Sequence, residues 1–213
     1  MVRAVLWDFG GVITTSPFEA FNRFERENGL PENFIRGINA TNPDANAWAR
    51  FERNDLDLAG FNTAFESESR AAGHPIPGEQ VVALLAGDVR PAMVAALRAC
   101  RERFICACLT NNFAVGDSAG MTFSAERTAE VQAAMALFHT IIESSKVGVR
   151  KPDPRIYQIV CEQLAVEPSE IVYLDDLGIN LKPARAMGMT TIKVTDPGAA
   201  LAELGRVLDL SLG

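Results

Sequence analysis

Carboxylates occur at two places in the sequence where an apolar run of strand length comes to its end. Asp8 lies at the end of the run Val2–Phe9, and Asp175 and Asp176 close the run that begins at Ile171. Three carboxylates held within a few ångströms of one another would take up protons unless a cation lay between them. A site rich in oxygen ligands suits Mg²⁺, which keeps several of its waters. The three aspartates are therefore candidate magnesium ligands.

Three further residues have side chains that suit an anionic substrate. Thr110 and Asn111 end another apolar run, and Lys151 lies in a Lys-Pro-Asp-Pro loop. A metal together with Lys151 would offset the charge of a phosphoryl group, while Thr110 and nearby backbone amides would donate hydrogen bonds to it. Asp8 would then be a covalent nucleophile, as carboxylates are in aspartyl-phosphate chemistry. The set predicts a site for a small phosphorylated molecule.

The elements that must position these residues are five short, β-rich apolar runs. They cover Val2–Phe9, Phe104–Thr110, Thr140–Glu143, Ile171–Asp175 and Thr190–Val194. The segments between the later runs have helical periodicity. Strands that alternate with helices in this way predict right-handed βαβ units and a Rossmann-like α/β core with a parallel sheet. Ligands bind outside the carboxyl ends of such strands, so the candidate residues would meet in one crevice.

Residues 16–87 break this alternation. Their aromatic residues recur at helical spacings, and we find no convincing strand among them. A segment of roughly 70 residues is too long for a single crossover connection. We therefore expect a small helical cap domain over 16–87, inserted into a core domain formed by 1–15 and 88–213. The alternative is that the segment only adds helices to the main domain.

Composition excludes several classes of protein. The chain of 213 residues has a formal net charge of −7 and a sequence pI of about 4.9, which argues against general binding of nucleic acid. Its apolar stretches are of strand length, so we expect no membrane span. The N-terminus lacks the features of a secretory signal, which predicts a cytoplasmic protein. The sequence leaves monomer and homodimer open.

The four cysteines are expected to be plain buried thiols, which behave as small hydrophobic groups. Cys106 and Cys108 lie two residues apart on one predicted strand, and we expect their thiols to face opposite sides of the sheet. Such an arrangement would suit neither a redox pair nor a zinc site.

In chain order, the candidate residues resemble the haloacid dehalogenase-like superfamily of hydrolases, over nearly the whole chain. The four motifs of that family match at Asp8, Thr110, Lys151 and Asp175-Asp176. The stretch from Ile142 to Tyr157 is typical of the branch with a helical cap after the first strand. The run from Pro168 to Met189 is similar to the amino-terminal phosphatase domain of soluble epoxide hydrolases.

The resemblance implies a magnesium site and a role for each of its residues. Asp8 would be both the nucleophile and a metal ligand. The carbonyl oxygen of Gly10 would be the second protein ligand and Asp176 the third. Asp175 would act next to the metal.

The resemblance also implies a site for the phosphoryl group. Thr110 and Asn111 would hold the phosphoryl oxygens, and Lys151 would pair with both the nucleophile and the phosphoryl group. The first strand would lie between the second and the fourth, which would bring the motifs together.

Position 10 departs from the family pattern. Family phosphatases usually carry a second aspartate there, which protonates the leaving oxygen and later activates water; this chain has Gly10. General acid–base help is worth about 10²–10⁴-fold in rate, so a plain alkyl phosphate should react slowly, whereas an acyl or aryl phosphate could still turn over. Asp117 is a candidate replacement acid, although an aspartate in a Gly/Ser-rich loop is usually a turn residue.

Three functions therefore compete. The first is a magnesium-dependent phosphatase, impaired or specialised by Gly10. The second is a module that binds Mg²⁺ and a phosphorylated ligand with little or no catalysis. The third is a dehalogenase-like hydrolase, for which the lost acid would not matter because halide leaves without a proton. The pair Asp175-Asp176 weighs against this third function, since that branch works without magnesium.

Overall fold

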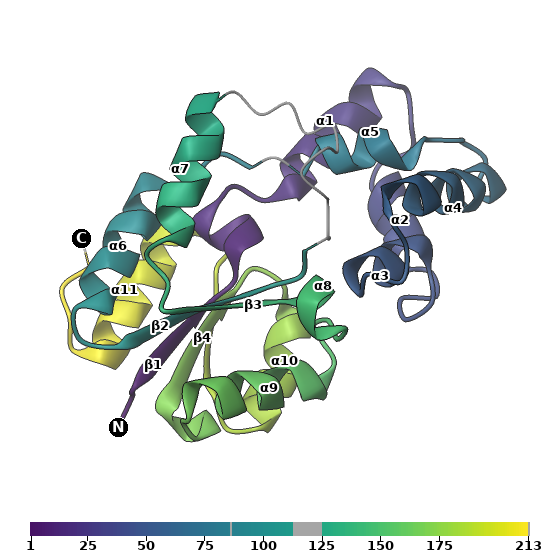
Figure 1. Cartoon of the computed structure of the whole chain (residues 1–213). Coiled ribbons are helices and arrows are strands. Elements are labelled where there is room, and N and C mark those ends of the chain that lie inside the picture. Colours follow the sequence, from purple (N-terminus) through teal and green to yellow (C-terminus); the bar gives the residue numbers. More distant parts are fainter. Residues whose placement is uncertain (86, 113–124, 213) are drawn as a thin grey trace.

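The core is a five-stranded parallel sheet in the order β3-β2-β1-β4-β5 (Figure 1). A computed structural model describes residues 1–85, 87–112 and 125–212 of the chain. The strands are β1 (Ala4–Trp7), β2 (Ile105–Thr110), β3 (Thr140–Glu143), β4 (Ile171–Asp175) and β5 (Thr190–Lys193). The predicted α/β class is confirmed, and β1 lies between β2 and β4 as the family resemblance implied.

The register of the sheet brings the chemically active residues to one edge. Trp7, the last residue of β1, lies opposite Cys108 of β2 and Leu174 of β4. The backbone N–H of Asp8 donates to the carbonyl oxygen of Leu174 at 2.9 Å. Asp8 therefore leaves the sheet at the level where β2 and β4 end in their own polar residues.

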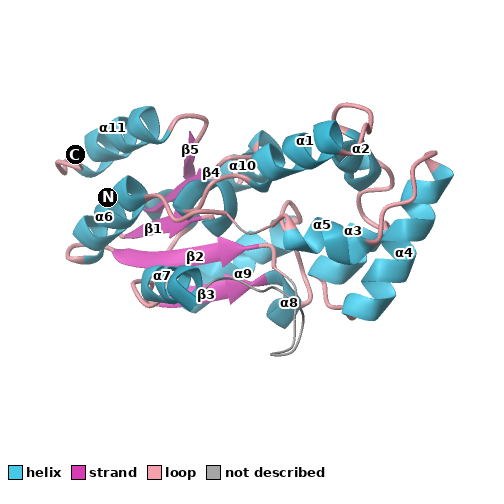
Figure 2. Ribbon diagram, turned by 90° about the horizontal axis from the view of Figure 1, so that it is seen from above, coloured by secondary structure: helices cyan, strands magenta, loops and turns pink. Residues whose placement is uncertain are grey.

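Helices cover both faces of the sheet (Figures 1 and 2). One face is covered by α6 (Pro91–Arg101), α7 (Ala125–Met135) and α11 (Pro197–Leu208), and the other by α9 (Pro154–Leu164) and α10 (Gly178–Ala186). Because β1 is buried on both faces, all four of its residues are apolar. Asp153 caps the N-terminus of α9, since its carboxylate accepts the N–H of Arg155 at 2.8 Å.

The expectation for the two strand cysteines was wrong. Cys106 and Cys108 lie in the same hydrophobic cluster as Trp7, whereas Ala107 and Leu109 face the other cluster. Residues two apart in a strand share a face, so the two thiols had to point the same way. The prediction of free, buried thiols holds for this pair, and burial raises the pKa of Cys106 to about 12.

The described part of residues 16–87, which we call the cap segment, contains five helices with a hydrophobic cluster of their own. They are α1 (Pro17–Glu27), α2 (Phe34–Ala40), α3 (Ala47–Glu52), α4 (Leu58–Ala71) and α5 (Gly78–Ala83). Phe21, Phe51, Phe61 and Phe65 are almost wholly buried at its centre. Figure 2 shows these helices beyond the carboxyl ends of the strands. They therefore lie on the side of the sheet where Asp8 emerges.

The chain enters and leaves this helical segment through two stretches that run side by side. The N–H of Thr15 donates to the carbonyl oxygen of Asp88, and the N–H of Arg90 donates to that of Ile13, both at 2.8 Å. Thr14 and Val89 form an isolated antiparallel bridge. The proposed division into a core of 1–15 and 88–213 and a cap of 16–87 falls at this junction.

The remaining described elements are short helical turns. They are η1 (Phe9–Ile13), α8 (Ser144–Val147) and η2 (Pro168–Glu170). None of the helices within 1–85, 87–112 and 125–212 is both long and apolar enough to cross a bilayer.

Candidate active site

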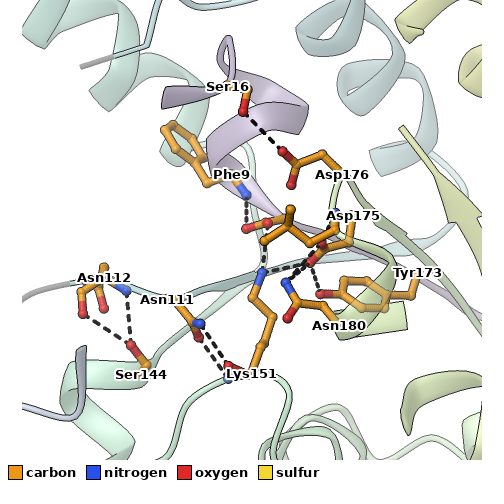
Figure 3. A network of polar contacts seen from close by, with 12 residues as sticks. Phe9, Ser16, Asn111, Asn112, Ser144, Lys151, Tyr173, Asp175, Asp176 and Asn180 are labelled. Carbon is orange, nitrogen blue, oxygen red and sulfur yellow. Dashed lines mark hydrogen bonds and ion pairs between the residues drawn. The ribbon is translucent and has the colours of Figure 1, made fainter. Parts of the chain in front are cut away.

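A buried ammonium group lies between two carboxylates at the carboxyl edge of the sheet (Figure 3). Nζ of Lys151 is 2.8 Å from Oδ2 of Asp8 and 2.9 Å from Oδ2 of Asp175, and only 2% of the lysine side chain is exposed. Burial alone would lower the pKa of Lys151, but the charges of Asp175 and Asp8 outweigh it and raise that pKa. The lysine therefore stays protonated beside Asp8.

Asp175 holds this lysine within a dense set of hydrogen bonds. Its Oδ1 accepts the N–H of Leu177 at 2.8 Å and the amide of Asn180 at 3.0 Å. Its Oδ2 accepts from Lys151, from Asn180 at 3.1 Å and from the hydroxyl of Tyr173. Burial raises the pKa of Asp175, but Lys151 and the Tyr173 hydrogen bond bring it below its ordinary value. Asp175 is thus an ionised anchor for Lys151.

Asp8, Asp175 and Asp176 form a cluster whose oxygen atoms could share one ion. One carboxylate oxygen of each lies within 4.8 Å of the others. Oδ1 of Asp8 accepts the N–H of Phe9 at 2.7 Å, and Oδ2 of Asp176 accepts from the hydroxyl of Ser16 at 3.3 Å. Oxygen donors of this kind are those that Mg²⁺ prefers.

Two of these carboxylates are held in an environment that disfavours their charge. Burial raises the pKa of Asp8 well above its ordinary value, even though Lys151 opposes the change. Burial and the charge of Asp175 raise the pKa of Asp176 to about 6. A divalent cation would offset this repulsion, so the residues present fit a metal site.

The two glycines after Asp8 differ in what they do. Gly11 has a φ of +80°, and a Cβ there would lie 2.2 Å from Oδ2 of Asp176. Gly11 therefore lets the chain turn and lets the Asp176 carboxylate approach the backbone. Gly10 has a φ of −68° and a ψ of 129°, which any residue adopts, and no described atom lies within 4 Å of a Cβ built there.

Thr110 and Asn111, at the end of β2, differ from each other in their surroundings. Thr110 lies opposite Glu143 of β3 and is 8% exposed. The carboxamide of Asn111 bonds the backbone of Lys151 at both ends, because its Nδ2 donates to the lysine carbonyl at 3.1 Å and its Oδ1 accepts the lysine N–H at 2.9 Å. The side chain of Asn111 thus fixes Lys151, so any contact with a phosphoryl oxygen falls to its backbone amide.

Sequence reasoning missed Tyr173 and Asn180. Tyr173 is two residues before Asp175 on the same strand, so alternation places both on one face of the sheet. Asn180 lies on the first turns of α10, and its carbonyl oxygen accepts the hydroxyl of Tyr157 at 2.6 Å. A side chain with a hydroxyl group among the apolar residues of β4 that precede Asp175 was the available signal for Tyr173. The candidate acid Asp117 lies outside the described residues.

Comparison with known proteins decides the family. The family model for haloacid dehalogenase-like hydrolase matches residues 2–188. The chain belongs to this family. Acyl-CoA dehydrogenase family member 10 of Mus musculus is 33% identical over an alignment of 216 positions, which covers 99% of this chain and 19% of that protein. Bifunctional epoxide hydrolase 2 of Sus scrofa is 32% identical over an alignment of 223 positions, which covers 99% of this chain and 40% of that protein.

This haloacid dehalogenase-like chain therefore spans less than half the length of those two relatives. The predicted relation to soluble epoxide hydrolases is confirmed by the second. A relative of similar length is the sesquiterpene phosphatase astK of Aspergillus oryzae, 24% identical over 209 residues, 97% of this chain and 96% of that protein.

Solved structures show the same fold. A HAD family enzyme of Bacteroides thetaiotaomicron, crystallised with magnesium and inorganic phosphate, superposes with a TM-score of 0.58 at 20% identity. The match covers 91% of this chain and 94% of the other.

The difference between the two glycines predicts different effects on stability. Gly11→Ala should destabilise the protein by about 1–3 kcal/mol, because alanine is strained at a positive φ and its Cβ would displace Asp176. Gly10→Ala should change stability little. Urea unfolding followed by circular dichroism measures both. Equal unfolding midpoints for the two variants would contradict the role given to Gly11.

The raised pKa of Asp176 predicts how pH and Mg²⁺ act together. Its folded pKa of about 6 exceeds the ordinary 3.8, so the folded state binds the extra proton and this group's contribution to stability falls as pH rises through that window. Mg²⁺ should therefore raise the thermal unfolding midpoint more at about pH 7.5 than at about pH 5, where it must displace protons. Asp176→Asn should lose most of the increase. A magnesium effect independent of pH would refute this account.

Proposed function

We propose that this protein is a magnesium-dependent phosphatase for a small phosphorylated molecule, with Asp8 as the nucleophile. The observation that carries the proposal is the 2.8 Å contact between Asp8 and the buried ammonium of Lys151, beside two further carboxylates. A fixed cation next to an ionised oxygen lets an anionic centre approach it. Membership of the family supports the same conclusion. So does the match to the sesquiterpene phosphatase astK, which extends over nearly the whole length of both proteins.

The metal would be held by Asp8, Asp176 and the carbonyl oxygen of Gly10. Both oxygens of Asp175 already accept hydrogen bonds, so Asp175 would act beside the metal rather than bind it directly. When bound, Mg²⁺ would supply positive charge that offsets the phosphoryl oxygens and the crowded carboxylates.

The chain's own residues account for the transfer itself. An oxygen of Asp8 attacks phosphorus, and the bond from phosphorus to the leaving oxygen breaks with its electron pair on that oxygen. Lys151, the hydroxyl of Thr110 and the backbone amide of Asn111 face the phosphoryl oxygens. Water then hydrolyses the aspartyl phosphate, which releases inorganic phosphate and restores the carboxylate of Asp8.

Gly10 restricts the substrates that this site can use. No carboxyl group at position 10 protonates the leaving oxygen, so that oxygen must leave as a weakly basic anion. Acyl and aryl phosphates meet this requirement, whereas alkyl and sugar phosphates do not. Apart from its chain neighbours, no described atom lies within 4 Å of a Cβ built at Gly10, so the site has room for a side chain at this position.

A panel of phosphate esters tests the reaction. With Mg²⁺, acyl and aryl phosphates should release phosphate about 10²-fold or more faster than alkyl and sugar phosphates. Removal of Mg²⁺ and the substitution Asp8→Asn should each abolish turnover. Full activity in Asp8→Asn would exclude Asp8 as the nucleophile. Phosphate binding without turnover would favour the binding module, and magnesium-independent halide release from 2-haloacids would favour the dehalogenase.

Restoring the missing carboxyl group tests the assignment of Gly10. The backbone at position 10 accepts any residue, so Gly10→Asp should fold. It should raise the rate of phosphoryl transfer to Asp8 by about 10²-fold or more for alkyl phosphates and little for aryl phosphates, because only poor leaving groups need the proton. Any gain from activation of water would be the same for both substrates, because they form the same aspartyl phosphate. Gly10→Asn is the matched control, with the same shape and no acid. Equal rates for the aspartate and asparagine variants would show that the lost acid is not what limits the enzyme.

A further inference from the structure

An ion pair joins the cap helices to the residue directly before Lys151. Nε of Arg150 lies 2.5 Å from Oε2 of Glu52, the last residue of α3. Nη1 of Arg150 donates to the carbonyl oxygen of Pro43 at 2.9 Å. Arg150 thus attaches the loop between α8 and α9 to two places in the helical segment.

The position of Glu52 is unfavourable for a carboxylate unless it has a partner. Its side chain is 7% exposed, and it lies at the C-terminal end of α3, where the helix dipole disfavours negative charge. Burial raises the pKa of Glu52, and the charge of Arg150 is the largest effect that opposes this. Trp48 and Lys151 also favour its ionised form. At this buried position, an apolar side chain would pack without the cost of burying a charge. We therefore explain the carboxylate of Glu52 by its ion pair with Arg150.

Lys151 is constrained on its other sides as well. Asn111 holds its backbone N–H and carbonyl oxygen, and Asp8 and Asp175 hold its Nζ. The ion pair between Arg150 and Glu52 adds a constraint that comes from the cap. Displacement of the cap would therefore pull on the peptide that carries Lys151.

We propose that Glu52 and Arg150 are a positioning pair, which keeps Lys151 aligned with Asp8 while the cap covers the carboxyl edge of the sheet. The inference rests on the proposed function, because it assumes that Lys151 binds the phosphoryl group. It assigns the cap a part in catalysis that does not require any cap residue to touch the substrate.

The kinetic test uses Glu52→Gln, Arg150→Gln and the double variant with an aryl phosphate, below the unfolding temperature of each. Each single variant should lower kcat about tenfold or more, since small displacements of catalytic groups cost rate steeply. The double variant should be no slower than the slower single variant, because both changes break one contact. Lowered thermal stability with unchanged kcat would overturn the proposal, as a purely structural pair would behave that way.

Arg70→Gln is the matched control. Arg70 forms an ion pair with Glu66 one turn away in α4, and 65% of its side chain is exposed. The variant removes the same charge as Arg150→Gln at a position outside the contact between Arg150 and Glu52. Its kcat should stay within about twofold of the wild type, as expected for a surface ion pair. A loss equal to that of Arg150→Gln would mean that cap charge, rather than the pair, governs the rate, and would overturn the proposal.

Hydrogen exchange tests the pair without relying on turnover. In the full chain without substrate, the peptide covering 148–156 should exchange faster than in the wild type in Glu52→Gln and Arg150→Gln. In Arg70→Gln it should exchange at the wild-type rate. Unchanged exchange in the first two variants would overturn the positioning role. If the wild type hydrolyses no phosphate ester but exchange rises as expected, the proposed function fails while the link between cap and Lys151 stands.

Discussion

A single buried ammonium group between two carboxylates is the constraint on which the site depends. Taking Lys151 out of water is costly unless opposite charges surround it, and Asp8 and Asp175 supply them from the ends of two adjacent strands. Lys151 must therefore lie on a loop close to the carboxyl ends of both strands. The hydrogen bonds from Asn111 to the backbone of Lys151 secure that loop from a third strand, so the sheet order and the site depend on each other.

Much of this arrangement could be predicted because its physical signals are local. β1 is apolar along its whole length because both of its faces are covered, and helix α9 begins with a proline after a capping aspartate. The rule that ligands bind at the carboxyl ends of parallel strands then placed Asp8, Thr110 and Asp175 together. Strand order is different, because periodicity carries no information about neighbours; it came from the family resemblance.

What the sequence did not reveal depends on contacts between residues far apart in the chain. Asn111 reaches Lys151 across 40 positions, and Arg150 reaches Pro43 across 107. Such side chain–backbone bonds leave no pattern in the sequence. The role of Asn111 at the phosphoryl group was implied by the family resemblance, which gave no sign of its bonds to the backbone of Lys151. The expectation for Cys106 and Cys108 was an error, because alternation along a strand already determined their common face.

Hydrogen bonds between Thr15 and Asp88 and between Ile13 and Arg90 hold the two ends of the helical segment together. This arrangement affects how such proteins can evolve. Because the helical segment begins and ends at neighbouring points, it forms a lobe with a narrow neck. A different lobe whose ends are equally close can be exchanged at that neck without altering a strand, as insertions are tolerated where entry and exit adjoin. The reacting groups and the surface that covers them can thus diverge independently, apart from the Glu52–Arg150 contact, which a new lobe would have to replace.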